Sequence, residues 1–182
     1  MTSATQASAD DPFRYGWRYV RREHAVNGEL YEQIPLTLED VLYPEVGDFV
    51  VHTKAHEDIC NYLLDVFNEQ VCEDASAAVL HDVRVAWDVP GLRPNGPDIT
   101  VFFGVQQQQN WATFDCAIEG VRPALIVEVT SPDTRHQDLG DKLEIYEEAE
   151  VWESGKVGKW ESAARVIHVE THYLVALKCG GY

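Results

Sequence analysis

The segment Ile126-Val127-Glu128-Val129-Thr130 places an acidic residue inside a run of apolar, mostly β-branched side chains, and Pro97-Asp98-Ile99 opens an earlier run of the same kind. β-Branched residues favour strands, so both runs are predicted to be strands buried in one sheet. An ionised carboxylate in a core strand costs several kcal/mol unless a cation, a partner or hydrogen bonds compensate it. Asp98 and Glu128 therefore suggest a shared cation, and a metal-dependent hydrolase is the first hypothesis.

The composition predicts one globular unit in a reducing compartment. The 182 residues are 45% hydrophobic and 10% aromatic, which is sufficient for a core. The four cysteines form no C-x-x-C pair, so we expect neither a zinc ribbon nor a disulfide framework. With no signal peptide and no apolar stretch of membrane-spanning length, a cytoplasmic protein without a membrane partner is expected. Residues 1–12 are predicted to be a disordered tail and residues 13–182 a single domain.

The charge balance argues against extended binding of nucleic acid. The formal net charge is −17, from 14 basic and 31 acidic residues. Binding of a polyanion normally uses clustered Lys and Arg. A cleft can still be locally positive, and a divalent ion would cancel part of the charge of acidic site residues. The net charge thus weakens a nucleic-acid hypothesis without excluding it.

Periodicity and turn residues predict an α/β (α+β) order of elements. Asn27-Gly28 indicates the turn of an N-terminal β-hairpin, whose interleaved arginines are more simply explained by one packed and one solvated face than by nucleic-acid binding. A capping box begins at Thr37, and Thr53 is the expected N-cap of an amphipathic helix that carries Glu57. The further expected elements are strands at 49–52, 79–85, 98–104, 124–130 and 166–177, a helix at 138–149 and a small hairpin at 151–160.

Four residues supply the chemistry that phosphodiester hydrolysis requires: Asp98, Glu128, Lys142 and Glu57. Mg²⁺ prefers a few carboxylate oxygens with retained water, lowers the pKa of water and neutralises charge on phosphoryl oxygens. A lysine ammonium can position the attacking water or stabilise the transition state.

The motifs Pro97-Asp98, Glu128 to Arg135, and Asp138 to Lys142 with Tyr146 resemble the bacterial family of Uma-type restriction endonucleases in the PD-(D/E)XK nuclease superfamily. Upstream segments are also similar, so that the resemblance covers residues 13–149. It implies a restriction-endonuclease-like mixed sheet of about four core strands flanked by helices. It further implies DNA as substrate, Mg²⁺ or Mn²⁺ as cofactor, Asp98 and Glu128 as metal ligands and the Val129 carbonyl as a third. Glu57 would occupy the acidic helix position.

The chain departs from the family pattern in two places. Thr130 stands where the superfamily has a lysine, and Lys142 on the next helix matches the place that serves instead in this family. Residues 150–168 are an apparent insertion before the last strand. This insertion leaves open whether the sheet edge is intact and whether a homodimer forms through it.

Simpler explanations remain open for the same residues. Asp98 could cap a strand, Lys142 could pair with Asp138 on a solvated helix face, and Glu57 could be structural. His52 and His56 have metal-ligand spacing but lack an evident third ligand, so His56 is expected to support the site through a hydrogen bond instead.

Two other function classes are compatible with the sequence. A binding or regulatory module that keeps the nuclease fold without activity would explain Thr130 and the acidic composition. A glycosidase would use Glu128 and Asp98 as acid and base, but such a site rarely needs a nearby lysine.

Overall fold

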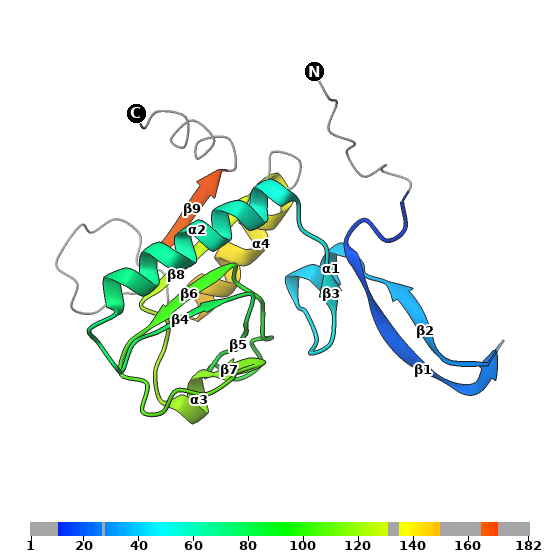
Figure 1. Ribbon diagram of the computed structural model, residues 1–182, viewed down its shortest axis with the longest axis horizontal. Helices are drawn as coiled ribbons and strands as arrows, with labels where there is room; N and C mark the ends of the chain where they lie inside the picture. Colours follow the sequence, from blue (N-terminus) through cyan, green and yellow to red (C-terminus); the bar gives the residue numbers. More distant parts are fainter. Residues whose placement is uncertain (1–10, 27, 131–134, 150–164, 171–182) are drawn as a thin grey trace, which may run out of the picture.

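The computed structural model describes residues 11–26, 28–130, 135–149 and 165–170 (Figure 1). The strands are β1 (Gly16–Val26), β2 (Glu29–Pro35), β3 (Phe49–Val50), β4 (Ala78–His81), β5 (Arg84–Ala86), β6 (Ile99–Phe102), β7 (Thr113–Asp115), β8 (Leu125–Thr130) and β9 (Arg165–Glu170). The helices are α1 (Leu38–Leu42), α2 (Lys54–Val71), α3 (Cys116–Glu119) and α4 (Arg135–Glu148). Among these residues, no helix combines the length and the apolar character needed to span a lipid bilayer.

A four-stranded sheet in the order β4-β6-β8-β9 lies at the centre of the fold. β6 pairs antiparallel with β4 and with β8, whereas β8 and β9 are parallel. The predicted mixed sheet is therefore confirmed. In the β6-β8 ladder Ile99 lies opposite Val127. Asp98 directly precedes β6 and accepts a hydrogen bond from the Val129 amide, which brings it next to Glu128 of β8.

Helices cover both faces of this sheet, as the family resemblance implied. Val129 packs with Ile59 and Cys60 of α2, whereas Ile126 belongs to the larger core cluster that includes Tyr146 of α4. Side chains alternate between faces along a strand, so Ile126 and Val129 project in opposite directions. α2 and α4 consequently lie on opposite faces, and Figure 1 shows α2 crossing the near one.

Both predicted N-caps are confirmed, whereas the third predicted helix, at 138–149, begins three residues earlier, at Arg135, as α4. The Thr53 side chain accepts a hydrogen bond from the backbone of His56 and begins α2. Thr37 and Asp40 form a reciprocal capping box at α1. These caps satisfy backbone N–H groups that have no partner within a helix. The Thr53 cap fixes the first residue of α2 and thereby which of its side chains face the sheet.

The expected single strand at 79–85 is wrong, because it is divided into β4 and β5. Asp82 has a φ of 54°, a left-handed conformation that ends an extended run. β5 leaves the central sheet and pairs in parallel with β7, and the Asp115 side chain caps α3 directly after β7. No element had been predicted at β7 or α3.

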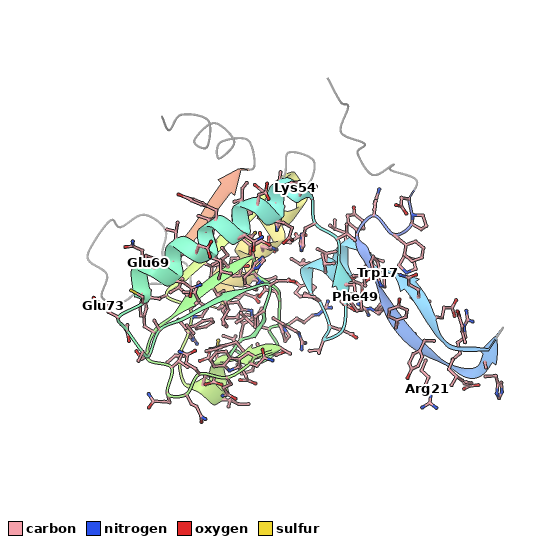
Figure 2. All side chains as sticks on the ribbon, viewed as in Figure 1. Trp17, Arg21, Phe49, Lys54, Glu69 and Glu73 are labelled. Atoms are coloured by element: carbon pink, nitrogen blue, oxygen red, sulfur yellow. The ribbon has the colours of Figure 1, made fainter. Side chains whose placement is uncertain are left out.

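The predicted N-terminal hairpin forms a second sheet in the order β2-β1-β3. β1 approaches β3 so closely that a Cβ on Gly16 would lie 1.9 Å from the Phe49 carbonyl oxygen, and φ at Gly16 is 114°. Trp17 stacks on Phe49 with a centroid separation of 5.6 Å. Beyond this base the hairpin is solvated: Tyr19 is 57% exposed, and Figure 2 shows Arg21 extending away from the helices. The expectation of one packed hairpin face holds only at Trp17.

Arg18 joins the hairpin to the segment that follows it. Its guanidinium group lies 2.7 Å from Asp40 and 2.8 Å from Asp48, whose side chain is almost fully buried. One guanidinium nitrogen shared by two carboxylates in a partly buried position fixes orientation more effectively than an exposed ion pair does. This arginine is therefore used for structure.

β9 forms an edge of the central sheet beside β8. The predicted final strand at 166–177 begins one residue earlier, at Arg165, and its part beyond Glu170 lies outside the described residues. The predicted hairpin at 151–160 and most of the predicted N-terminal tail also lie outside them.

Candidate active site

Asp98 lies at the start of β6 and is held from two directions. Its Oδ2 accepts a hydrogen bond of 2.6 Å from the Val129 backbone N–H on β8. Its Oδ1 lies 3.4 Å from Nε2 of His56 on α2. Because its side chain is only 12% exposed, Asp98 has little freedom to leave this position.

Glu128 occupies the neighbouring strand and is contacted from α4. Lys142 Nζ lies 2.6 Å from Glu128 Oε2, and the Tyr146 hydroxyl donates to Oε1. Lys142 and Tyr146 are four residues apart and thus share one face of the helix. Glu128 is buried, so both its oxygens are paired with groups of α4 instead of bulk solvent.

A chain of buried hydrogen bonds stands behind Glu128. Asn95 Nδ2 donates to the Tyr146 hydroxyl over 3.0 Å, and Trp87 Nε1 donates to Asn95 Oδ1 over 3.0 Å. The sequence predicted that Tyr146 packs on the sheet and belongs to the family motif, but not that it binds Glu128, and it did not indicate Asn95 or Trp87. The spacing from Lys142 to Tyr146 was a usable signal, whereas Asn95 lies in a turn-rich connection where a polar residue is unremarkable.

The two carboxyl groups differ in their affinity for protons. Burial opposes ionisation of Asp98, but the Lys142 charge, His56 and the Val129 amide outweigh burial and lower the pKa of Asp98 to about 2. At Glu128 burial dominates and, together with the charge of Asp98, raises the pKa to about 7 in spite of Lys142. In the metal-free site Asp98 is thus much the stronger acid, and Glu128 keeps its proton to a higher pH than an exposed glutamate does.

The first turns of α2 contribute further polar groups. The imidazole rings of His52 and His56 stack with centroids 4.3 Å apart. Burial lowers the pKa of His52, whereas at His56 the Asp98 carboxylate and Glu57 overcome burial and raise the pKa. Among the described residues two groups bring three ligand-type atoms within 4.8 Å of one another: His52, His56 and Glu57, and His56, Cys60 and Asp98.

The structure brings most of the predicted site residues together. Asp98, directly before β6, contacts β8 beside Glu128 through the Val129 amide, and Lys142 reaches Glu128 from α4. Glu57 lies with His52 on the α2 side. Val129 contacts Asp98 through its amide, while metal binding by its carbonyl stays a prediction, as do the catalytic and metal-binding roles of the other residues.

A mixed sheet with one acidic residue directly before a central strand, a second acidic residue on the neighbouring strand, and helices on both faces matches the restriction-endonuclease-like class that the sequence predicted. The model of the family described as "Uma2: Putative restriction endonuclease" matches residues 21–172. The chain belongs to this family.

Two further comparisons were made. The chain is similar to a crystal structure from Anabaena variabilis, described as a "putative nuclease belonging to DUF820", with 20% sequence identity and a TM-score of 0.42. The match covers 58% of this chain and 59% of that one, so the chain spans less than two thirds of the other protein's length. A search of curated proteins gave no significant match.

Proposed function

We propose that the protein is an endonuclease that hydrolyses DNA phosphodiester bonds with Mg²⁺ or Mn²⁺ as cofactor. The observation that carries the proposal is the hydrogen bond that holds Asp98 on the Val129 amide, next to Glu128 on β8, together with the pairing of Lys142 with Glu128. Membership of a family described as restriction endonucleases supports DNA as the substrate.

The donor atoms suit a hard divalent ion. Asp98 stays ionised in a nearly buried position, and each carboxylate oxygen retains a lone pair beyond the hydrogen bond it already accepts. Asp98, Glu128 and the Val129 carbonyl would hold the ion. When bound, the ion would lower the pKa of water and neutralise charge that develops on the phosphate.

Residues of α4 control the state of Glu128. Lys142 Nζ pairs with Oε2 and keeps a positive charge beside both acidic groups, where a phosphate diester would also be attracted. The Tyr146 hydroxyl fixes the direction of Oε1. Because Lys142 reaches Glu128 from the helix, it can serve in place of the strand lysine that Thr130 replaces.

Residues of α2 position Asp98. His56 lies against Oδ1 while the Val129 amide occupies Oδ2, so the carboxylate plane is held from both ends. Glu57 lies one residue further along the helix and adds negative charge that favours protonation of His56. We assign His56 and Glu57 positioning roles, and the homodimer suggested by the resemblance is part of the same proposal.

The test is cleavage of plasmid DNA by purified full-length protein with Mg²⁺ or Mn²⁺. Nicking or linearisation that stops on addition of chelator is expected. Asp98→Asn protein, purified identically, should be inactive, whereas Asp58→Asn at an exposed position of α2 should cleave normally; this pair excludes a contaminating nuclease. Absence of cleavage over a range of salt concentrations, or cleavage that is indifferent to chelator, would overturn the proposal.

The net charge of −17 favours a second candidate, a nuclease-fold module that binds a partner without hydrolysis. Calorimetry with Mg²⁺ and Mn²⁺ separates the two. A protein of this second class binds neither ion at millimolar concentration, and its heat signal is the same in Asp98→Asn.

A further inference from the structure

His56 and Cys60 of α2 lie close to Asp98. The proposed cleavage reaction uses neither of them as a metal ligand. His56 and Cys60 are one helical turn apart, and their nitrogen and sulfur atoms lie with a carboxylate oxygen of Asp98 in a group whose members are all within 4.8 Å of one another. Cys60 is fully buried, whereas the His56 and Asp98 side chains retain 11% and 12% exposure. The group therefore lies at the border of the core, where two of its three ligand-type side chains keep a small contact with solvent.

The donor types identify a class of ion. Mg²⁺ takes oxygen ligands and avoids thiolates, whereas imidazole and thiolate together select Zn²⁺ and related transition metals. Bond lengths to Zn²⁺ of about 2.0–2.3 Å place the ligand atoms of a tetrahedral site roughly 3.3–3.8 Å apart. The distance of 3.4 Å from His56 Nε2 to Asp98 Oδ1 is long for a hydrogen bond but falls within that interval.

The other group, formed by His52, His56 and Glu57, is less suitable. A metal ion lies in the plane of an imidazole ring that binds it. The His52 and His56 rings are stacked with an interplanar angle of 8°, so their lone pairs run parallel and do not converge on one point. His52 instead packs against His56 and restricts rotation of its ring.

We propose that His56, Cys60 and Asp98 form a binding site for Zn²⁺ or a similar thiophilic ion, which inhibits the protein by occupying the Asp98 carboxylate. Cys60 binds as thiolate and its proton passes to solvent. A water molecule from solvent completes four-fold coordination. The inhibitory part rests on the proposed function, because it requires that Asp98 also serve Mg²⁺.

Binding is tested with Co²⁺, which replaces Zn²⁺ at tetrahedral sites and absorbs visible light. Titration of the full chain should give a thiolate-to-cobalt charge-transfer band in the near ultraviolet that Zn²⁺ abolishes. Cys60→Ser should remove the band and weaken Co²⁺ binding by at least about tenfold. Cys72→Ser, at an exposed free thiol just beyond α2, is the matched control and should retain the band. A band that persists in Cys60→Ser, or no band in the wild type, would refute the site.

Inhibition is tested separately by comparing, within each variant, Mg²⁺-dependent cleavage with and without micromolar Zn²⁺. The wild type and Cys72→Ser should be inhibited at least about tenfold more strongly than Cys60→Ser. Equal inhibition of all three would refute the competition for Asp98. If the cobalt band behaves as expected but neither the wild type nor any variant cleaves DNA, the proposed function is refuted and the metal site is supported. If the wild type cleaves DNA normally but shows no cobalt band, the metal site is refuted and the proposed function is supported.

Discussion

The carboxyl groups on the α2 side and on the α4 side of the site have pKa values that are shifted in opposite directions. On the α2 side Asp98 receives a backbone hydrogen bond and lies against His56. Although burial opposes its ionisation, the charge of Lys142, His56 and the Val129 amide lower its pKa to about 2. On the α4 side Glu128 has a lysine and a tyrosine as partners, yet its pKa rises to about 7 because burial dominates. Adjacent strands thus hold one fixed charge and one exchangeable proton.

This difference teaches that partners alone do not determine the charge of a buried acid. Lys142 stabilises both anions, but the cost of removing Glu128 from water exceeds that gain, and Asp98 adds repulsion. Asp98 ionises more readily than Glu128 because the Lys142 charge, His56 and the Val129 amide all favour its anion. A bound divalent ion would remove the asymmetry by favouring the ionised form of both groups.

The largest expected effect is on catalysis. Glu128→Gln removes a charge from the α4 side while preserving shape, and under the proposed mechanism cleavage should fall about 1000-fold, since several kcal/mol of transition-state stabilisation are lost. Glu69→Gln, at an exposed position near the far end of α2 (Figure 2), is the control. The measurement is the initial rate of plasmid nicking at saturating Mg²⁺. If the nicking rate of Glu128→Gln lay within tenfold of the wild-type rate, catalysis would depend on the α2 side of the site alone.

The next effect is the pH dependence of stability in chelator. The folded pKa of Glu128 is raised from 4.5 to about 7, so the folded state retains a proton that the unfolded state releases. The free energy of unfolding should therefore fall by about 3 kcal/mol as pH rises from 4.5 to 7, and stay level above that range. Urea denaturation should show this slope in the wild type and not in Glu128→Gln.

Titration of Asp98 should change the free energy of unfolding at lower pH than Glu128 does, and in the opposite direction. Its folded pKa lies below the ordinary 3.8, so its contribution is present above that value and is lost as pH falls from 3.8 toward 2. Asp98→Asn should remove this acid-side loss and leave the slope between pH 4.5 and 7. If both variants changed the same pH range, the two sides would titrate as one unit and the comparison would fail.

A smaller loss is expected from Tyr146→Phe. The change leaves Asn95 Nδ2 and Glu128 Oε1 without their hydroxyl partner inside the core, which should cost about 1–3 kcal/mol of unfolding free energy. Tyr62→Phe, at an exposed position of α2, should change stability by less than about 0.5 kcal/mol. Equal melting temperatures for the two variants would show that the buried hydrogen-bond chain does not stabilise the α4 side.

The smallest effect concerns an exposed ion pair. Lys54 lies 2.7 Å from Asp58, close to the 2.6 Å between Lys142 and Glu128, but the Lys54 side chain is 86% exposed. Lys54→Ala should lower stability by only about 0.3–0.5 kcal/mol, and salt should reduce even this difference. A loss above about 1 kcal/mol would imply that distance, and not burial, sets the strength of ion pairs in this protein.

Local sequence patterns predicted the elements that position the site. The apolar runs around Asp98 and Glu128 located β6 and β8, and Thr53 located the start of α2, because strand burial and helix capping leave signals within a few residues. The motif that contains Lys142 predicted its place near Glu128. Nearly all of these correct predictions concern interactions between residues that are close together in the sequence.

The missed features depend on long-range contacts or on single backbone conformations. Asn95 meets Tyr146 across 51 positions of sequence, and nothing in its turn-rich surroundings marks it as buried. The left-handed conformation of Asp82 divides a run whose composition is typical of one strand. The approach of Cys60 and His56 to Asp98 requires the packing of α2 on the sheet, which explains why no third metal ligand was evident.

The parallel pairing of β9 with all of β8 has a consequence for synthesis of the protein on the ribosome. β8 carries Glu128, but one of its edges is completed only by residues 165–170, which emerge late. Until then the nascent chain presents an unpaired apolar strand to its surroundings, and such edges recruit other chains. Translation that pauses before Arg165 should therefore favour aggregation or chaperone capture, which makes the order of emergence a determinant of the yield of folded protein.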